Sequence, residues 1–88
     1  MVVNNRGQNR FELEVDGHRA LAVYRIEGNR ISFVHTEVPA ELEGQGVGSR
    51  LVGGALEQVR DERLKVVPLC SFVRHYMETH QETADLLA

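Results

Sequence analysis

A glycine-rich segment that joins an apolar strand to an amphipathic helix constrains this chain more than any other feature. The segment runs from Val38 to Ser49 and has glycines at alternate positions, Gly44, Gly46 and Gly48. Glycine has no Cβ, so the backbone can come close to a ligand there. The N–H groups in the first turn of a helix have no partner within the helix, and the helix dipole makes that end attractive to anions. The segment therefore predicts a turn that binds phosphate groups.

Two common phosphate-binding turns do not fit this spacing. A P-loop requires Lys and then Ser or Thr after its last glycine, whereas Gly48 is followed by Ser49 and Arg50. A dinucleotide-binding turn spaces its glycines G-x-G-x-x-G in a sheet built from several βαβ units, and 88 residues have room for one such unit. The anion must belong to another class of ligand.

The first half of the chain predicts an antiparallel sheet. Residues 1–9 are rich in Asn, Arg and Gly, and we expect a loose segment there. From Arg10 to Val15 apolar and acidic residues alternate, which is typical of a half-buried strand. Asp16-Gly17 and Gly28-Asn29 then predict hairpin turns on either side of a second strand, His18 to Glu27. A third strand is expected from Arg30 to Val38.

The second half predicts a parallel strand between two helices. An apolar stripe predicts a helix from about Val47 or Ser49 to Glu62, with Gly53-Gly54 explained by a close approach of helix to sheet. Residues 64–69 form a short apolar strand, which lies parallel to the third strand if the crossover is right-handed. Ser71 is placed to cap a second helix, and residues 82–87 predict a final turn. The expected fold is α/β (α+β), one domain over residues 10–88 in the order βββαβα.

Composition excludes several classes of protein. The net charge of −3 contains no block of like charges, so it does not indicate nucleic acid as a partner. No apolar run resembles a signal peptide or a membrane span, and the single cysteine, Cys70, permits no internal disulfide. We expect a cytoplasmic protein with no membrane partner, either a monomer or a weak homodimer. His18, His75 and His80 share no metal-ligand spacing with Cys70, so no metal is expected.

The glycine segment resembles the acetyl-CoA-binding signature of the GNAT acetyltransferase superfamily. Gly46 and Gly48 match the glycine positions of that signature, although Glu43 stands where the superfamily has Gln or Arg. With His35-Thr36-Glu37-Val38-Pro39 and Cys70-Ser71-Phe72-Val73-Arg74-His75-Tyr76, the chain is similar to the minimal YjdJ-type branch from about Ile31 to Leu87. The resemblance implies acetyl-CoA as cosubstrate, held between splayed parallel strands. The residues that it implies for acetyl-CoA binding are Thr36, Glu37, Val38, Gly44, Gln45, Gly46, Val47, Gly48 and Ser49.

Two side chains are candidates for the chemistry of acetyl transfer. Cys70 directly precedes a predicted helix, where the helix dipole favours the thiolate. It either accepts the acetyl group or protonates the departing CoA thiolate, and the alternative is a buried cysteine that only packs. His35 lies two residues from Glu37 on the same face of its strand, so it can relay a proton. The alternative for His35 is a strand-end histidine bonded to backbone.

These inferences predict an acetyl-CoA-dependent N-acetyltransferase that acts on a primary amine. The amine can belong to a small molecule, a peptide or a protein. The alternative is a CoA-binding or protein-interaction module without catalysis, because 88 residues leave out the additional elements that form acceptor pockets in larger relatives.

Overall fold

Three antiparallel strands form the larger part of the sheet. The computed structural model describes residues 1–88 and places β2 (Arg10–Val15), β3 (His18–Glu27) and β4 (Arg30–Glu37) side by side. The connections are the two tight turns predicted at Gly17 and Gly28. All three strands lie where the sequence predicted them, and β4 ends one residue before the predicted end at Val38.

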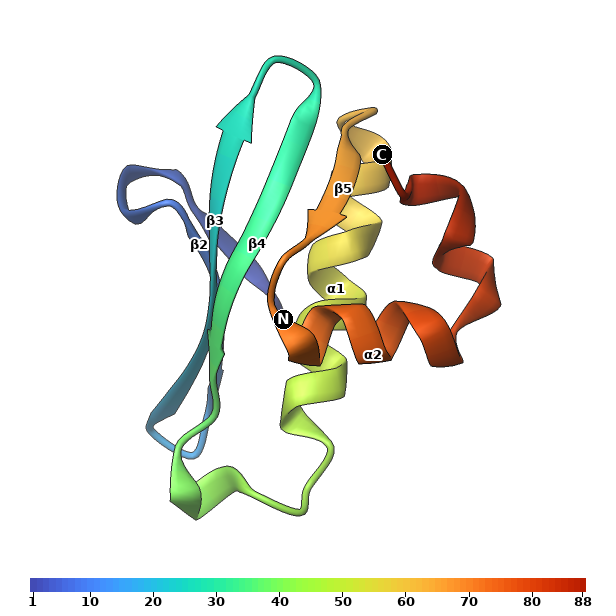
Figure 1. The fold of residues 1–88 in the computed structure, drawn as a ribbon. Helices are drawn as coiled ribbons and strands as arrows, with labels where there is room; N and C mark the ends of the chain where they lie inside the picture. Colours follow the sequence, from blue (N-terminus) through green and yellow to red (C-terminus); the bar gives the residue numbers. More distant parts are fainter.

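A parallel crossover completes the fold. Helix α1 (Val47–Asp61) leads to β5 (Lys65–Pro68), which pairs in parallel with β4, and α2 (Ser71–Thr79) follows. A 3-10 turn over Gln81–Leu86 ends the chain. Both helices lie on one side of β2, β3 and β4, and the other side of these strands carries no helix (Figure 1). Neither helix has the length and apolar character that a membrane crossing requires.

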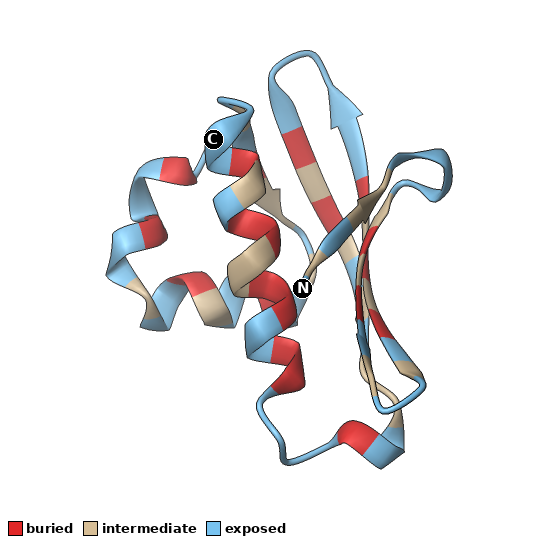
Figure 2. Cartoon of the chain, turned by 180° about the vertical axis from the view of Figure 1, so that it is seen from behind, coloured by how far each residue is buried: buried red, intermediate tan, exposed pale blue.

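The core fills the space between α1 and the sheet. Figure 2 shows the buried bands of α1 turned toward the strands. The apolar stripe predicted for this helix is fully buried, and it consists of Leu51, Val52, Ala55, Leu56 and Val59. Opposite it, the rings of Phe11, Tyr24 and Phe33 form a cluster with centroids 5.2 to 6.3 Å apart. The spacing of apolar residues therefore determined which side of each element is buried.

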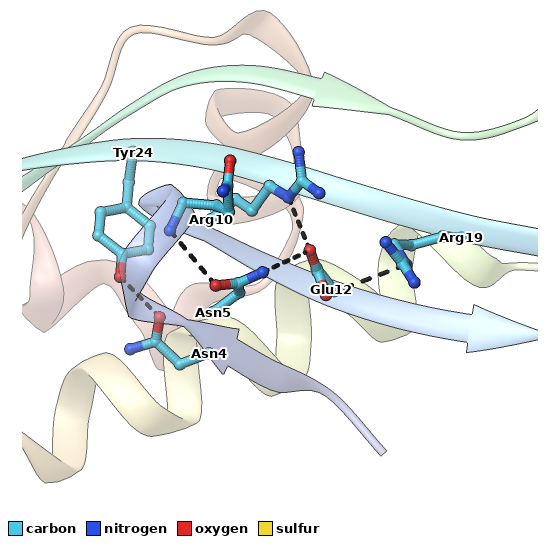
Figure 3. Close-up of polar contacts among 7 residues, drawn as sticks. Asn4, Asn5, Arg10, Glu12, Arg19 and Tyr24 are labelled. Carbon is cyan, nitrogen blue, oxygen red and sulfur yellow. Dashed lines mark hydrogen bonds and ion pairs between the residues drawn. The ribbon is translucent and has the colours of Figure 1, made fainter.

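The N-terminal segment is not loose, which corrects the prediction for residues 1–9. Val3–Asn5 form an additional strand, β1, which pairs antiparallel with β2, so the strand order is β1-β2-β3-β4-β5. Side chains hold this strand in place (Figure 3): the Tyr24 hydroxyl donates to Asn4 Oδ1 at 2.6 Å. Gln58 of α1 also donates to the Val2 carbonyl at 2.9 Å. The local composition of residues 1–9 is typical of a loop. It carries no information on Tyr24 and Gln58, the residues distant in sequence that anchor the strand.

A polar cluster on β1 and β2 fixes their register (Figure 3). Glu12 accepts hydrogen bonds from Arg10 Nε at 2.6 Å and from Asn5 Nδ2 at 3.1 Å. Arg19 Nε lies 4.0 Å from the same carboxylate. The bond from Arg10, followed by that from Asn5, holds the pKa of Glu12 below its ordinary value.

Gly53 and Gly54 inside α1 do not face the sheet. The prediction that they allow a close approach of the helix to the sheet is therefore wrong. A Cβ on Gly53 would lie 2.8 Å from the Tyr76 hydroxyl of α2, and one on Gly54 would lie 2.5 Å from a methyl group of Val2. The glycines therefore admit α2 and the N-terminal segment to the surface of α1. Each of these contacts compensates for the lower helix propensity of glycine.

A β-bulge in β4 changes which side chains face the helices. Val23 pairs with His35 and Tyr24 pairs with Phe33, so Val34 is an extra residue without a partner. After the bulge Thr36 pairs with the fully buried Ala22 and shares its face of the sheet. His35 and Glu37 consequently face the side that carries no helix.

Asn4→Ala tests whether the N-terminal strand is anchored by its side chains. The change leaves the Tyr24 hydroxyl without its acceptor, in a residue only 2% exposed. We expect the free energy of unfolding, measured by urea denaturation, to fall by about 1–3 kcal/mol. In a Tyr24→Phe background the same substitution should cost much less, and an equal cost in both backgrounds would exclude the hydrogen bond as the anchor.

Candidate active site

The glycine loop presents a continuous row of free backbone donors. Gly44 and Gly46 have φ angles of 78° and 72°, which disfavour any residue with a Cβ. The first hydrogen bond of α1 runs from the Arg50 N–H to the Gly46 carbonyl at 3.1 Å. No N–H from Gly44 to Ser49 has an acceptor within the protein. The loop and the first turn of α1 therefore present a row of free donors, and such an arrangement suits an anion.

A groove of about 290 Å³ lies directly against these donors. It extends from the end of β4 across the loop to the first turn of α1. Glu43 is an exposed residue on its wall, so an acidic residue adjoins the donors in sequence. The residues that line the groove are Val38, Leu42, Glu43, Gly44, Gly46, Val47, Gly48, Ser49 and Phe72. Most of the residues that the sequence implied for coenzyme binding thus lie around one groove.

Phe72 of α2 covers the first turn of α1. A Cβ on Gly48 would lie 2.5 Å from Cζ of the Phe72 ring, so glycine allows the ring to rest on the backbone. The ring remains 39% exposed. The sequence did not predict this contact, which joins elements distant in the chain. The sequence feature that could have indicated this contact is Gly48, the third glycine of the loop.

The parallel strands separate beside this groove. Their last paired residues are Phe33 and Pro68, and the Cys70 N–H then donates to the Phe33 carbonyl at 2.9 Å. Strand β4 continues to Glu37, while the chain after Pro68 turns into α2. Thr36 and Glu37 therefore belong to a part of β4 that β5 does not cover, as the predicted splay required.

Cys70 occupies the N-cap position of α2 and faces Thr36. Its Sγ lies 3.3 Å from Thr36 Oγ1. Burial raises the pKa of the Cys70 thiol, but the hydrogen bond from Thr36 and the backbone N–H groups of Val73, Phe72 and Thr36 outweigh it, and the net pKa is lower than usual. Ser71, predicted as the cap of α2, is the first helical residue, and α2 has no side-chain cap.

His35 is not brought together with Cys70. Its Nε2 lies 2.8 Å from Glu37 Oε2, and both side chains are more than half exposed on the face that carries no helix. Cys70 meets β4 from the opposite face, through Thr36. The two candidate side chains therefore address different sides of the separated strands.

The fold and this site define a GNAT-type acyltransferase domain, with a glycine loop at a helix N-terminus and two parallel strands that separate beside it. Residues 10–86 match the family described as GCN5-related N-acetyl-transferase. A solved structure similar to this chain is the NMR solution structure of a GCN5-like protein from Staphylococcus aureus, described as a candidate N-acetyltransferase. The TM-score is 0.76 at 33% identity, over 100% of this chain and 87% of that one. The chain belongs to the GCN5-related N-acetyltransferase family.

Thr36→Val tests the environment of the Cys70 thiol. The substitution removes the hydroxyl that lies 3.3 Å from Sγ, so the pKa of Cys70 should rise and less thiolate should be present near neutral pH. We expect slower alkylation by iodoacetamide and a pH–rate profile displaced toward higher pH. Ser71→Ala is the matched control, because the Ser71 side chain makes no capping bond. Coincident profiles for wild type and Thr36→Val would contradict this account.

Proposed function

We propose that this chain transfers an acetyl group from acetyl-CoA to a primary amine. The observation that carries the proposal is the run of free N–H groups from Gly44 to Ser49 along one groove. A diphosphate needs several donors at close range, and the missing Cβ atoms of Gly44, Gly46 and Gly48 let the backbone approach it. Family membership supports the same ligand.

The separated strands would hold the acyl end of the cosubstrate. Val38 lines the groove at the end of β4, so an arm that leaves the diphosphate on this side reaches Thr36 and Cys70. Backbone groups of β4 beyond Phe33 are free of β5 and suit hydrogen bonding to an extended arm. A backbone N–H at this point would also stabilise negative charge on the thioester oxygen during attack.

We propose that Cys70 accepts the acetyl group before the amine does. Its lowered pKa favours the thiolate, which makes it a better nucleophile and a poorer proton donor. In the first step Sγ bonds to the acyl carbon and the bond from that carbon to the coenzyme sulfur breaks. In the second step the amine nitrogen attacks the same carbon, its bond to Sγ breaks, and the nitrogen loses a proton. We assign that proton to His35, which requires the amine to approach between the separated strands from the face that carries no helix, where His35 lies beside Glu37.

The alternative is an acetyl-CoA-binding module without turnover. One observation favours it: none of the cavities in the structure is lined by Cys70 or Thr36, so no acceptor pocket is preformed beside the thiol. Such a module would still bind the coenzyme through the glycine loop. Release of free CoA in the presence of an amine separates the two functions.

Intact-mass analysis after incubation with acetyl-CoA tests the two-step mechanism. We expect one acetyl adduct on the wild-type chain and none on Cys70→Ala. His35→Ala should retain the adduct but transfer it to a test amine about 100-fold more slowly, the scale of general-base catalysis. Amine acetylation at the wild-type rate by Cys70→Ala would remove Cys70 from the mechanism, and binding without any turnover would support the module.

Glu43→Gln tests whether the glycine loop binds the diphosphate, because this variant should bind CoA more tightly. Glu43 lines the groove, so removal of its negative charge should strengthen the binding of a polyanionic coenzyme. Unit charges about 4 Å apart in water interact by about 1 kcal/mol, so calorimetry should show a dissociation constant for CoA roughly fivefold lower. Glu41→Gln is the control, because Glu41 is exposed nearby but does not line the groove. Weaker binding by Glu43→Gln would place the diphosphate elsewhere.

A further inference from the structure

A cavity of about 280 Å³ lies on the side of α2 that faces away from α1. Successive residues of a helix are about 100° apart, so Arg74 and Glu78 lie on the opposite side of α2 from Phe72, which rests on α1. Helix α2 therefore separates this cavity from the groove at the glycine loop. The residues that line the cavity are Pro68, Arg74, Met77, Glu78 and Leu87.

Two large apolar residues are exposed at this cavity. Leu87 lines it and is 46% exposed, and Leu69, which directly follows Pro68, is 54% exposed. The position of Leu87 is fixed because the Ala88 N–H donates to the Val66 carbonyl at 2.9 Å, so the end of the chain lies beside β5 (Figure 1). Apolar residues that gather at a cavity, unlike apolar residues scattered singly, mark a surface that binds a partner.

The position of this cavity relative to Cys70 indicates which partner that is. Pro68 on its wall is two residues before Cys70. Arg74, also on its wall, is one helical turn after Cys70 and donates its N–H to the Cys70 carbonyl at 3.0 Å. Because the groove for the coenzyme lies on the other side of α2, this surface is free to hold the body of the acceptor while its amine enters between the separated strands.

The charges beside the cavity favour a peptide as that acceptor. Arg74 and Glu78 have opposite charges, and neither forms an ion pair within the protein. A lipid surface or a nucleic acid would bring negative charge against Glu78, whereas the backbone of a peptide offers both donors and acceptors. An extended peptide advances about 3.3 Å per residue, so a side chain in the cavity belongs to a residue about two positions from the one at Cys70.

We propose that the acceptor is a peptide or protein segment, and that the cavity between Pro68 and Leu87 binds an apolar side chain about two residues from the reacting amine. This proposal rests on the proposed function and names its class of acceptor. Leu69 and Leu87 determine the specificity, because a bound apolar side chain removes their exposed surface from water.

Acetylation of paired peptides by the full chain tests this proposal. Each peptide has a blocked N-terminus and one lysine, and the members of a pair differ only in Leu or Ala at the second residue before or after that lysine. We expect kcat/KM to be at least about tenfold higher for the Leu peptide in one of these two pairs, the scale of burying a leucine side chain, and the difference to lie in KM. Leu69→Ser and Leu87→Ser should each bring the ratio within that pair close to one.

A matched variant and a second measurement serve as controls. Val3 is 53% exposed on β1, at the opposite edge of the sheet from β5, so Val3→Ser should keep the wild-type ratio. Methyl NMR signals of Met77 and Leu87 report binding without acetyl-CoA, because both residues line the cavity. They should shift on addition of the Leu peptide and much less on addition of the Ala peptide.

The outcomes separate this proposal from the proposed function. Equal kcat/KM within both pairs, a ratio unaffected by Leu69→Ser and Leu87→Ser, or acetylation of n-butylamine but of neither peptide would overturn the peptide site alone. A dimer that is detected by sedimentation and dissociates in Leu69→Ser would assign the surface to a second copy of this chain, which would also overturn the peptide site. Acetylation of neither the peptides nor n-butylamine would overturn the proposed function with it.

Discussion

The candidate active site depends on the place in the sheet where the pairing of β4 with β5 ends. Phe33 and Pro68 are the last partners. Pro68 has no N–H with which to extend a ladder, and Val34 on the facing strand forms a bulge directly after Phe33. Both strands thus carry an interruption at the same place. As a result Cys70 enters α2 beside Thr36 instead of continuing the sheet, and the backbone of β4 up to Glu37 is left without a β5 partner.

Local sequence patterns predicted the helices and strands of this fold better than the contacts between them. Alternation of apolar residues located β2, the turn residues at Gly17 and Gly28 located β3 and the start of β4, and the stripe from Leu51 to Val59 located α1, because each of these signals is local. Strand β1 was missed because it is held by Tyr24 and Gln58, which are far away in sequence. The bulge at Val34 was missed for a similar reason: nothing in the local sequence marks it, yet it decides that Thr36 and not His35 faces Cys70. The assignment to the YjdJ-type branch stays a prediction.

The free N–H groups of the glycine loop lie in an acidic chain, so composition could not locate this site. The net charge is −3, and an acidic side chain, Glu43, lines the groove. The favourable potential comes from backbone N–H groups at the start of α1, which no count of charged residues records. Only the spacing of the glycines between a strand and a helix carried that information.

The three glycines of the loop look equivalent in sequence but meet different requirements. Gly44 and Gly46 adopt positive φ angles, and their role is to turn the backbone so that its donors face the groove. Gly48 is already helical, and its role is to leave room for the Phe72 ring. Gly53, farther along α1, makes room in the same way for Tyr76. Contacts at these two helical glycines bring the side chains of Phe72 and Tyr76 against the backbone of α1. The loop motif and the paired helices are therefore parts of one arrangement, in which α1 supplies the donors and α2 supplies Phe72 as part of the wall of the groove.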